Sequence, residues 1–484
     1  MKPWSPYNTL FRSERYGWFL HNTLSGIMLE MDEPHKMMVE SLRDGNAPSV
    51  EVSDERDFIG LLETNGFLAE RESELLKLME LRYQRNAACF GTGYVGLTIC
   101  PTLACNFACP YCFEHSQADL TVMDESTMDA LVAFVKKHND ARHLSVSWYG
   151  GEPTLAFDVI EKLTAKFIEL FPDYADAGMV TNGYLLDQSK IDRLNDLRIT
   201  NVQITLDGNA ATHDRRRKLR NGEGTYDRIL QNIDLLMASS WKGECAVRVN
   251  VDKTNQSEYA RLHKALMERY KGKKLSVYPG HVNTFEGHEY GQACGLCNPE
   301  WSGFQIDGYR NEGITPRGGF FPGSGAMNTC IATSHQGFVI GPKGELYKCW
   351  EEVGKESMVV GSLHQEPFLS NPGLLARYAI GTDPHGDSEC MECKAFPICG
   401  GGCVNKRMRA KQFGEGGHEF CSPLKESLEL YLDAYMDTWH TSQICNAVLG
   451  KGKMPSMEKG YRMVQPERKA ETAKNPLESL ATQE

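Results

Sequence analysis

The sequence lacks any apolar run long enough to cross a membrane. None of its segments reaches about 18 consecutive apolar residues, so we expect no transmembrane helix and no membrane partner. The opening segment Met1–Pro6 has no apolar stretch of the kind found in secretory signals. These absences predict a cytoplasmic protein.

Basic residues are also scarce relative to acidic ones. Lys and Arg number 52 against 64 Asp and Glu, which gives a net charge of −12 at pH 7. Such a balance argues against nucleic acid as the main partner. At 484 residues the chain exceeds the size of one hydrophobic core, so we expect roughly two to four domains.

Cysteine, by contrast, is abundant, with 16 in the chain. Without a secretory signal, disulfide bonds are a poor explanation for so many thiols. Their close spacing in groups instead indicates metal centres. Four cysteines fall outside the groups and are expected to be buried structural thiols: Cys89, Cys100, Cys245 and Cys445.

Residues 92–285 alternate between strand-like and helix-like patterns. Strands are predicted at 94–100, 144–149, 178–181, 202–206, 246–251 and 275–278. Helices are predicted at 125–138, 159–170, 189–197, 226–239 and 257–270. Such alternation forms a parallel sheet with right-handed crossovers. Six strand–helix units are two short of a closed barrel, so we expect a partial barrel whose side opening admits a substrate as large as a peptide.

Residues 1–85 are predicted to form a separate small α/β module. We expect a β-hairpin, two helices and a returning strand, at 18–22 with 27–31, at 34–42 and 54–65, and at Phe67-Leu68. This order of elements resembles a winged-helix module that recognises the leader of a substrate peptide. The alternative is a structural cap on the next domain.

The C-terminal part of the chain loses the alternation. Residues 286–440 are rich in Gly and Cys, which predicts a fold organised by metal rather than by a large core. Residues 448–484 are charged, polar and poor in aromatic residues. We expect them to form a disordered or loosely attached tail.

Three cysteines lie on one short loop directly after the first predicted strand of the barrel. Cys105, Cys109 and Cys112 have the x3 and x2 spacing that holds an iron–sulfur cluster. A [4Fe–4S] cluster needs four ligands, so three thiolates leave one iron free to bind another molecule. The loop is expected at the carboxyl ends of the strands, where barrel active sites are built. A zinc site is the alternative for this spacing.

Further motifs follow the later strands of the barrel. The turn Gly150-Gly151-Glu152-Pro153 comes after the second strand, and Thr181-Asn182-Gly183 comes after the third. Thr205-Leu206-Asp207-Gly208 follows the fourth strand, with His213-Asp214 and Arg217 downstream. Because the carboxyl ends of parallel strands meet at one mouth, these residues are expected around the cysteine loop.

Together these motifs resemble the radical S-adenosylmethionine (SAM) signature, with its GGEP turn and the SLDG…HD…R pattern of its peptide-modifying members. The resemblance implies a cluster on the three thiols whose open iron chelates the amino acid end of SAM. It assigns the SAM ribose to Thr205 and the SAM carboxylate to Arg217, whose planar fork matches a carboxylate. Arg215, Arg216 and Lys218 are expected on a solvated surface.

The resemblance also implies which residues bind the amino group and the adenine of SAM. The turn after the second strand is expected to bind the amino group, because its glycines let the backbone approach and its carboxylate complements the positive charge of that group. An aromatic residue of the cysteine loop and a residue of the fifth strand are expected to pack against the adenine. The aromatic residue also has the alternative role of shielding the cluster. The residues implied are Gly150, Gly151 and Glu152 for the amino group, and Tyr111 and Val249 for the adenine.

The remaining cysteine groups resemble the seven-cysteine SPASM domain, which carries two auxiliary [4Fe–4S] clusters, for three clusters in all. The resemblance assigns the distal cluster to Cys390, Cys393, Cys399 and Cys421. It assigns the nearer cluster to Cys330, Cys349 and Cys403. The fourth ligand of the nearer cluster is Cys294 or Cys297, or the iron stays open for substrate. Zinc binding is the alternative for such a set.

The resemblance implies a radical SAM/SPASM peptide maturase. Its fold class is α/β: a partial (β/α)6 TIM-like radical SAM barrel, with an N-terminal winged-helix-like module and a C-terminal iron–sulfur SPASM domain. The cluster reductively cleaves SAM, and the 5′-deoxyadenosyl radical takes hydrogen from a peptide or small protein that carries a leader segment. The expected electron donor is a reduced flavodoxin- or ferredoxin-type protein.

Several products are compatible with this chemistry. A thioether cross-link is the first choice, and a carbon–carbon or carbon–oxygen cross-link is the second. In the sulfatase-maturing branch of the resembled family, an Asp that acts as a base directly follows the second SPASM cysteine. This chain has Trp350 at that position, which argues against that branch. A multi-cluster electron-transfer protein is the alternative of another class. Gly150–Pro153 and Arg217 argue against it, because an electron carrier needs no SAM pocket.

Overall fold

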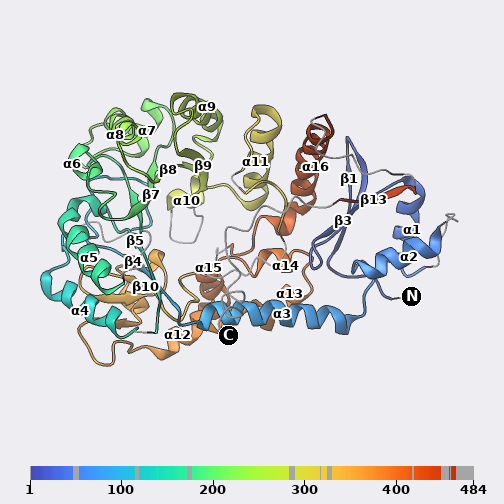
Figure 1. The fold of residues 1–484 in the computed structure, drawn as a ribbon, viewed down its shortest axis with the longest axis horizontal. Helices are drawn as coiled ribbons and strands as arrows, with labels where there is room; N and C mark the ends of the chain where they lie inside the picture. Colours follow the sequence, from blue (N-terminus) through green and yellow to red (C-terminus); the bar gives the residue numbers. More distant parts are fainter. Residues whose placement is uncertain are drawn as a thin grey trace.

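The computed structural model describes residues 2–46, 54–114, 119–138, 140–171, 177–282, 289–316, 318–323, 330–416, 419–448, 457 and 459–464. Figure 1 shows a long parallel sheet with its helices at one end of the molecule and a small antiparallel sheet at the other. Helix α3 (Arg71–Phe90) runs along the lower edge between them. Among the described residues, no helix is long and apolar enough to span a bilayer.

The N-terminal module is a four-stranded antiparallel sheet with two helices. Its first elements are β1 (Asn8–Ser13), β2 (Gly17–Asn22), β3 (Ile27–Met31), α1 (Glu33–Arg43) and α2 (Glu55–Thr64). The predicted hairpin is confirmed as β2 and β3, which pair from Trp18 with Met31 to Asn22 with Ile27. The predicted third strand at Phe67-Leu68 is wrong, since Leu68 makes only an isolated bridge to Trp4. The third strand is β1, which pairs with β2.

The fourth strand of this sheet comes from the far end of the chain. Strand β13 (Tyr461–Val464) pairs with β3 in antiparallel register. Arg462 binds the buried Glu30 of β3, with 2.6 Å between Nη2 and Oε2. The ring of Tyr461 packs against Phe58 of α2 at a centroid distance of 4.9 Å. The expectation of a loosely attached tail is therefore wrong for residues 461–464.

The sequence patterns did not indicate α3, a 20-residue helix that links the two ends of the molecule. Its hydrophobic face is narrow, with Leu78 and Cys89 among the few buried apolar residues. Polar contacts attach it to the C-terminal region instead. Arg82 Nε donates to Asp383 Oδ2 at 2.8 Å, and Arg85 Nη1 lies 3.9 Å from Asp383 Oδ1.

The barrel sheet contains the six predicted parallel strands in chain order, which confirms the expected α/β arrangement. They are β4 (Tyr94–Ile99), β5 (His143–Trp148), β6 (Ala177–Thr181), β7 (Ile199–Thr205), β8 (Glu244–Val251) and β9 (Leu275–His281). The helices between them are α4 (Glu125–Lys136), α5 (Phe157–Leu170), α6 (Gln188–Ile191), α7 (Ala210–Arg216), α8 (Tyr226–Ala238) and α9 (Tyr259–Arg269). In the described chain β9 does not pair with β4, so the sheet stays open.

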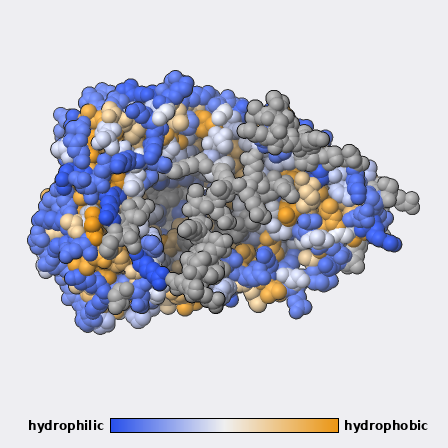
Figure 2. Space-filling view, viewed as in Figure 1, coloured by the Kyte–Doolittle hydropathy of each residue, from blue (hydrophilic) through white to orange (hydrophobic). Residues whose placement is uncertain are grey.

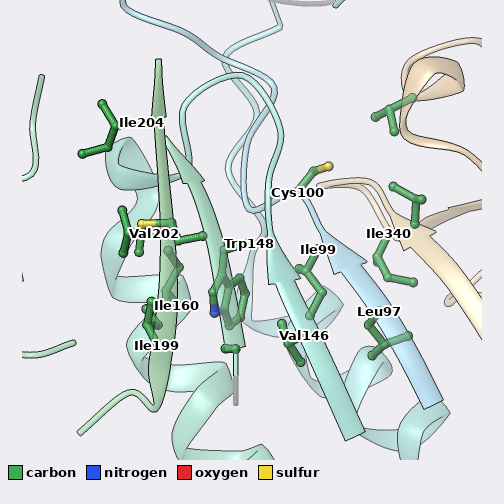
Figure 3. Packing of buried hydrophobic residues seen from close by; sticks show 14 of the residues in the cluster. Leu97, Ile99, Cys100, Val146, Trp148, Ile160, Ile199, Val202, Ile204 and Ile340 are labelled. Carbon is green, nitrogen blue, oxygen red and sulfur yellow. The ribbon is translucent and has the colours of Figure 1, made fainter. Parts of the chain in front are cut away.

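The two faces of the barrel strands differ in character. Apolar side chains face the helices, as Figure 3 shows for Leu97, Ile99, Val146 and Trp148, and they form one continuous core. The alternate positions face the inside of the barrel, and many of them are polar, including Ser147, Gln203, Thr205, Arg248 and Asn250. Since successive strand residues point to opposite faces, this alternation decides which side chains reach the site.

The C-terminal region extends the barrel sheet past β4. Strand β10 pairs in parallel with β4, and β11 and β12 continue antiparallel. The elements are α10 (Glu289–Cys294), α11 (Asn298–Glu312), β10 (Gly337–Ile340), β11 (Glu345–Tyr347), β12 (Gly361–Ser362), α12 (Pro372–Ala379), α13 (Ser388–Met391), α14 (Phe396–Cys399), α15 (Val404–Met408) and α16 (Leu424–Val448). Figure 2 shows that the middle of this face of the molecule is hollowed.

Candidate functional site

A cavity of about 360 Å³ lies at the carboxyl ends of the barrel strands. The loop after β4, the turn after β5 and inward-facing residues of β5 to β9 line it, and the segment after β11 adds to its wall. The predicted site residues that line it are Cys105, Cys109, Tyr111, Cys112, Gly150, Gly151, Thr205 and Arg217. Glu152 and Val249 are absent from its lining.

The three thiols of the cysteine loop face this cavity from partly buried positions. Burial raises the pKa of the Cys105 thiol to about 12 and that of the Cys112 thiol to about 11. Asn182, which follows β6, donates from Nδ2 to Asn106 Oδ1 at 2.8 Å and lies 4.0 Å from Cys105 Sγ. A bound metal centre favours the thiolate form of such thiols.

The glycines after β5 bring their turn against the cysteine loop. Gly150 has φ +109°, and a Cβ there would overlap the carbonyl oxygen of Thr102. A Cβ on Gly151 would overlap the carbonyl oxygens of Leu103 and Ala104. Only glycine allows this approach, so both residues close-pack two loops as well as line the cavity.

The carboxylate of Glu152 is fully buried behind the cavity wall. Its Oε1 accepts from Thr154 N at 3.0 Å and Thr181 Oγ1 at 2.7 Å, and its Oε2 accepts from Asn182 N at 2.6 Å. Burial raises the pKa of this carboxyl group, and the hydrogen bonds lower it. Glu152 thus joins the turn after β5 to the loop after β6. Its expected contact with the SAM amino group stays a prediction.

A network of charged and phenolic groups holds the far side of the cysteine loop. Tyr111 OH donates to Asp207 Oδ2 at 2.5 Å and accepts from Arg217 Nη1 at 2.6 Å. Arg216 is buried, not solvated as expected, and pairs with Asp207 at 3.3 Å and Asp252 at 2.6 Å. In the described structure Arg217 Nε is buried without a hydrogen-bond partner. Arg217 is the cation of this network left with room for an anion.

The motif residues His213 and Asp214 contact the start of α8, next to the network of Tyr111, Asp207, Arg216 and Arg217. His213 Nε2 lies 3.0 Å from Thr225 Oγ1, and burial lowers the pKa of this histidine well below its usual value, which keeps it neutral. Asp214 Oδ1 accepts from the backbone N–H groups of Thr225 and Tyr226 at 2.7 and 2.9 Å. These contacts fix the start of α8, so both residues position the loop that carries Arg217.

The side chain of Val249 points away from the cavity. Val249 is 1% exposed and belongs to the apolar core on the helix side of the sheet. Its neighbours Arg248 and Asn250 face the cavity in its place. The expected contact between the Val249 side chain and a bound adenine is therefore not supported by the geometry.

An aromatic pair forms another wall of the cavity. The ring of Trp350, in the segment after β11, stacks on Tyr149, which follows β5, with a centroid distance of 5.9 Å and an interplanar angle of 26°. Both rings line the cavity, together with Glu351 and His281. The position where the sulfatase-maturase pattern has Asp is therefore part of an aromatic surface.

Four C-terminal thiols gather around the start of α16. Burial raises the pKa of the Cys421 thiol, Lys425 opposes this, and the nearby thiols of Cys399, Cys390 and Cys393 raise it further. Cationic groups point at two of these sulfurs. Arg407 Nη1 lies 3.3 Å from Cys390 Sγ, and Lys425 Nζ lies 3.9 Å from Cys421 Sγ. The structure thus brings together the four residues expected to hold the distal cluster.

Three consecutive glycines separate this group from the next cysteine. Gly400, Gly401 and Gly402 have φ angles of 61°, 91° and 74°, and a Cβ on Gly402 would overlap the carbonyl oxygen of Phe420. These glycines form the turn between Cys399 and Cys403. Cys403 lies close enough to Cys349 for the two thiols to interact electrostatically. Burial raises the pKa of the Cys349 thiol, and Cys403 raises it further.

The other expected ligands of the nearer cluster are Cys330 and one of Cys294 and Cys297. Cys330 lies beside Cys89 and Lys348. Burial lowers the pKa of Lys348 to about 7, although the thiols of Cys330 and Cys89 act to raise it. Cys294 ends α10, and the exposed Cys297 precedes α11. The assignment of Cys330, and of Cys294 or Cys297, to the same cluster as Cys349 and Cys403 stays a prediction.

The site residues fit an iron–sulfur cluster with SAM better than a single metal ion. Across the described ranges, no three His, Cys, Asp or Glu side chains are placed to hold one ion, which argues against a preformed zinc site. A cluster has its own volume, so its thiolates stand farther apart than ligands of one ion do. The buried, unpaired Arg217 Nε suits the carboxylate of SAM.

Comparison with known proteins gives concordant results. Residues 99–266 match the radical SAM superfamily. A cysteine-type anaerobic sulfatase-maturating enzyme of Clostridium novyi (strain NT) is 24% identical over 358 residues, covering 67% of this chain and 91% of that protein. A serine-type anaerobic sulfatase-maturating enzyme of Klebsiella aerogenes is 23% identical over 322 residues, covering 62% of this chain and 77% of its own length.

Solved structures share the fold. The native enzyme anSMEcpe with bound AdoMet is 22% identical, covers 73% of this chain and 99% of its own, and superposes with a TM-score of 0.53. Residues 99–266 match a radical SAM domain, and together with the sulfatase-maturating relatives this match indicates a radical SAM enzyme. Its curated relatives include sulfatase-maturating enzymes of both the cysteine and the serine type.

Proposed function

We propose that this enzyme installs a cross-link, a thioether in the first instance, within a peptide or small protein substrate. The SAM-binding part of the proposal is supported by the three thiols, Thr205 and the unpaired Arg217 around one cavity. When bound, the reduced cluster and SAM supply a 5′-deoxyadenosyl radical that takes hydrogen from the substrate. The protein's part is to hold the reactants and exclude water.

Each residue of the cavity has a separable task in this proposal. Cys105, Cys109 and Cys112 hold the cluster. Arg217 binds the SAM carboxylate through a guanidinium that Tyr111 orients. Thr205 donates to the ribose, and Gly150-Gly151 places backbone groups beside the amino end.

One observation carries the choice of a cross-link over sulfatase-type oxidation. The residue after Cys349 is Trp350, and its ring stacks on Tyr149 in the cavity wall. An indole has no lone pair with which to take a proton, so it cannot replace a carboxylate base. The aromatic surface instead suits packing against an apolar part of the substrate.

The auxiliary centres are proposed on the C-terminal thiols. Cys390, Cys393, Cys399 and Cys421 hold a distal [4Fe–4S] cluster, beside the cations Arg407 and Lys425. Cys349 and Cys403 hold part of a nearer one. The region that surrounds both is proposed to be a SPASM domain, whose clusters take an electron from the substrate radical or bind a substrate thiolate.

The N-terminal module is proposed to recognise the leader of the substrate in a winged-helix-like manner. Its sheet has the order β1-β2-β3-β13. An extended peptide can bind such a sheet as an added strand. Because β1 and β13 are the edge strands of this sheet, a leader that adds in this way pairs with one of them. The electron donor is proposed to be a reduced flavodoxin or ferredoxin.

The experiment that tests the cross-link is mass spectrometry of a peptide co-expressed with the enzyme, chosen from the small open reading frames beside its gene. A cross-link removes two hydrogens per bond, and the modified peptide resists alkylation at cysteine. Co-expression with the Cys105→Ala variant is the control. Unmodified peptide with wild-type enzyme, for every neighbouring frame, contradicts the proposal.

A second candidate is sulfatase-type oxidation, favoured by the relatives and by Glu351, a carboxylate that lines the cavity next to Trp350. The products of the two reactions differ in mass. Oxidation of cysteine to formylglycine removes the sulfur, whereas a thioether retains it. A synthetic cysteine peptide with a sulfatase modification sequence therefore distinguishes them, and an aldehyde product would favour the second candidate.

A further inference from the structure

One cation in the cavity has no role in the proposed SAM site. Arg248 lies on β8, level with Thr205 of β7 and Tyr278 of β9, and its side chain lines the cavity. Its one hydrogen bond in the described structure runs from Nε to Asn250 Oδ1 at 2.8 Å. The terminal nitrogens of the guanidinium, which are its best donors to an anion, have no protein partner there.

The surroundings hold this guanidinium in place. A Cβ on Gly280 of β9 would overlap Arg248 Nε, so the glycine leaves the space in which the group lies. Asn250, which accepts from Arg248, also donates from Nδ2 to Tyr111 OH at 3.2 Å. Arg248 is therefore anchored at Nε while its terminal nitrogens remain open, an arrangement that favours bidentate binding of a carboxylate.

Glu114 and Glu351 line the same cavity, but in the described structure neither makes an ion pair with Arg248. Other buried carboxylates nearby are bound to other groups. Arg216 holds Asp207 and Asp252, and the buried Glu152 accepts from loop donors. In the proposed function the SAM carboxylate goes to Arg217. A partly buried cation without a counterion is costly, so Arg248 is expected to receive its anion from outside the chain.

We propose that Arg248 binds the side-chain carboxylate of an Asp or Glu residue in the substrate peptide, next to the position that reacts. The inference rests on the proposed function. It names an acidic peptide segment as the substrate class. The Tyr149–Trp350 pair lies in the same cavity as Arg248, so an acidic side chain there finds an aromatic surface for its methylene groups and a cation for its charge.

The test maps arginine modification in the full-length, cluster-reconstituted enzyme under anaerobic conditions. Phenylglyoxal labels accessible guanidinium groups, and digestion with mass spectrometry reports each site. With SAM present, we expect millimolar N-acetyl-aspartate N-methylamide to slow labelling of Arg248 by about threefold or more, as a charge-assisted pair would. The neutral asparagine analogue should not slow it. Exposed Arg228 is the internal reference and should label equally throughout.

Three results would overturn the inference. They are protection of Arg248 by SAM alone, equal protection by the asparagine analogue, and no labelling of Arg248 in the enzyme without probe. Stronger protection by N-acetylalanine would assign the site to a chain-terminal carboxylate and overturn the side-chain assignment. Failure of the proposed function is distinguishable, because then no 5′-deoxyadenosine forms when the reconstituted enzyme is incubated with SAM and dithionite.

Discussion

At the scale of single residues, Glu152 joins two loops of the site through one buried carboxylate, and Asn182 extends the connection to a third. Glu152 accepts from the backbone N–H groups of Thr154 and Asn182 and from the hydroxyl of Thr181. Asn182 in turn contacts Asn106 and Cys105 on the cysteine loop. The geometry of the thiol loop therefore depends on a residue that does not face the cavity.

The substitution Glu152→Gln is predicted to weaken this support. It replaces one acceptor oxygen by an amide nitrogen, which leaves a buried N–H or hydroxyl unpaired at a cost of about 1–3 kcal/mol. We expect a lower midpoint of thermal unfolding even without SAM, measured by circular dichroism. Glu169→Gln on the exposed face of α5 is the control. An unchanged midpoint with impaired SAM binding would instead show direct contact with SAM.

The sequence located most of the residues around the cavity but not the face of each strand. The loop thiols, Gly150, Thr205 and Arg217 follow strand ends, and any parallel sheet brings strand ends together. Val249 was expected in the site, although the apolar–polar alternation of residues 246–251 already places Arg248 and Asn250 on the other face. Burial of Arg216 could not be predicted, because its partner Asp252 lies on a different strand connection.

At the scale of elements, β13 attaches the end of the described chain to its beginning. Glu30 on β3 is 4% exposed, and Arg462 on β13 is its counterion. The guanidinium of Arg462 also lies over the ring of Trp439 on α16, 5.4 Å from its centroid. One arginine thus ties a strand, a helix and a buried carboxylate together.

The substitution Arg462→Ala is predicted to release this strand. A buried carboxylate left without its partner costs about 3 kcal/mol or more. We expect faster hydrogen exchange at the amides of β3 and β13, measured by mass spectrometry, with no change in the barrel strands. The matched control is Lys271→Ala, since Lys271 and Glu268 form an ion pair that is 78% exposed on both sides. Unchanged exchange in β3 would show that pairing alone holds β13.

Elements with strong local signals were predictable, and elements defined by distant partners were not. Helix α1 begins where Asp32 caps it and Pro34 follows, and both signals are in the sequence. Strand β13 has four residues, and its partner β3 lies more than 400 residues earlier. Helix α3 was missed because polar contacts such as Arg82–Asp383, rather than a broad apolar face, fix its position.

At the scale of the whole molecule, the two halves of the structure differ in what stabilises them. The barrel has one continuous apolar core that includes β4–β9 and their helices. The segment from α13 to the start of α16 has short helices, four glycines with positive φ and clustered thiols. Its fold is expected to depend on metal in a way that the barrel does not.

Removal of iron is predicted to unfold the C-terminal region first. After chelation under reducing conditions, limited proteolysis should cut within residues 384–416, while the barrel resists. The fragments can be assigned by mass spectrometry, with the untreated holoenzyme as the control. Equal resistance of the chelated and untreated proteins would show that packing alone holds this region.

The most direct test of the central claim is SAM cleavage by the reconstituted enzyme with dithionite, followed by chromatography of 5′-deoxyadenosine. Cys445 lies outside the groups and is exposed, so the expectation that it is buried is wrong. We expect the wild-type enzyme and Cys445→Ala to form 5′-deoxyadenosine. Cys105→Ala is expected to form none, and Cys421→Ala is expected to form it without a cross-linked product. Absence of 5′-deoxyadenosine with the wild-type enzyme, or equal cleavage by Cys105→Ala, would contradict the account.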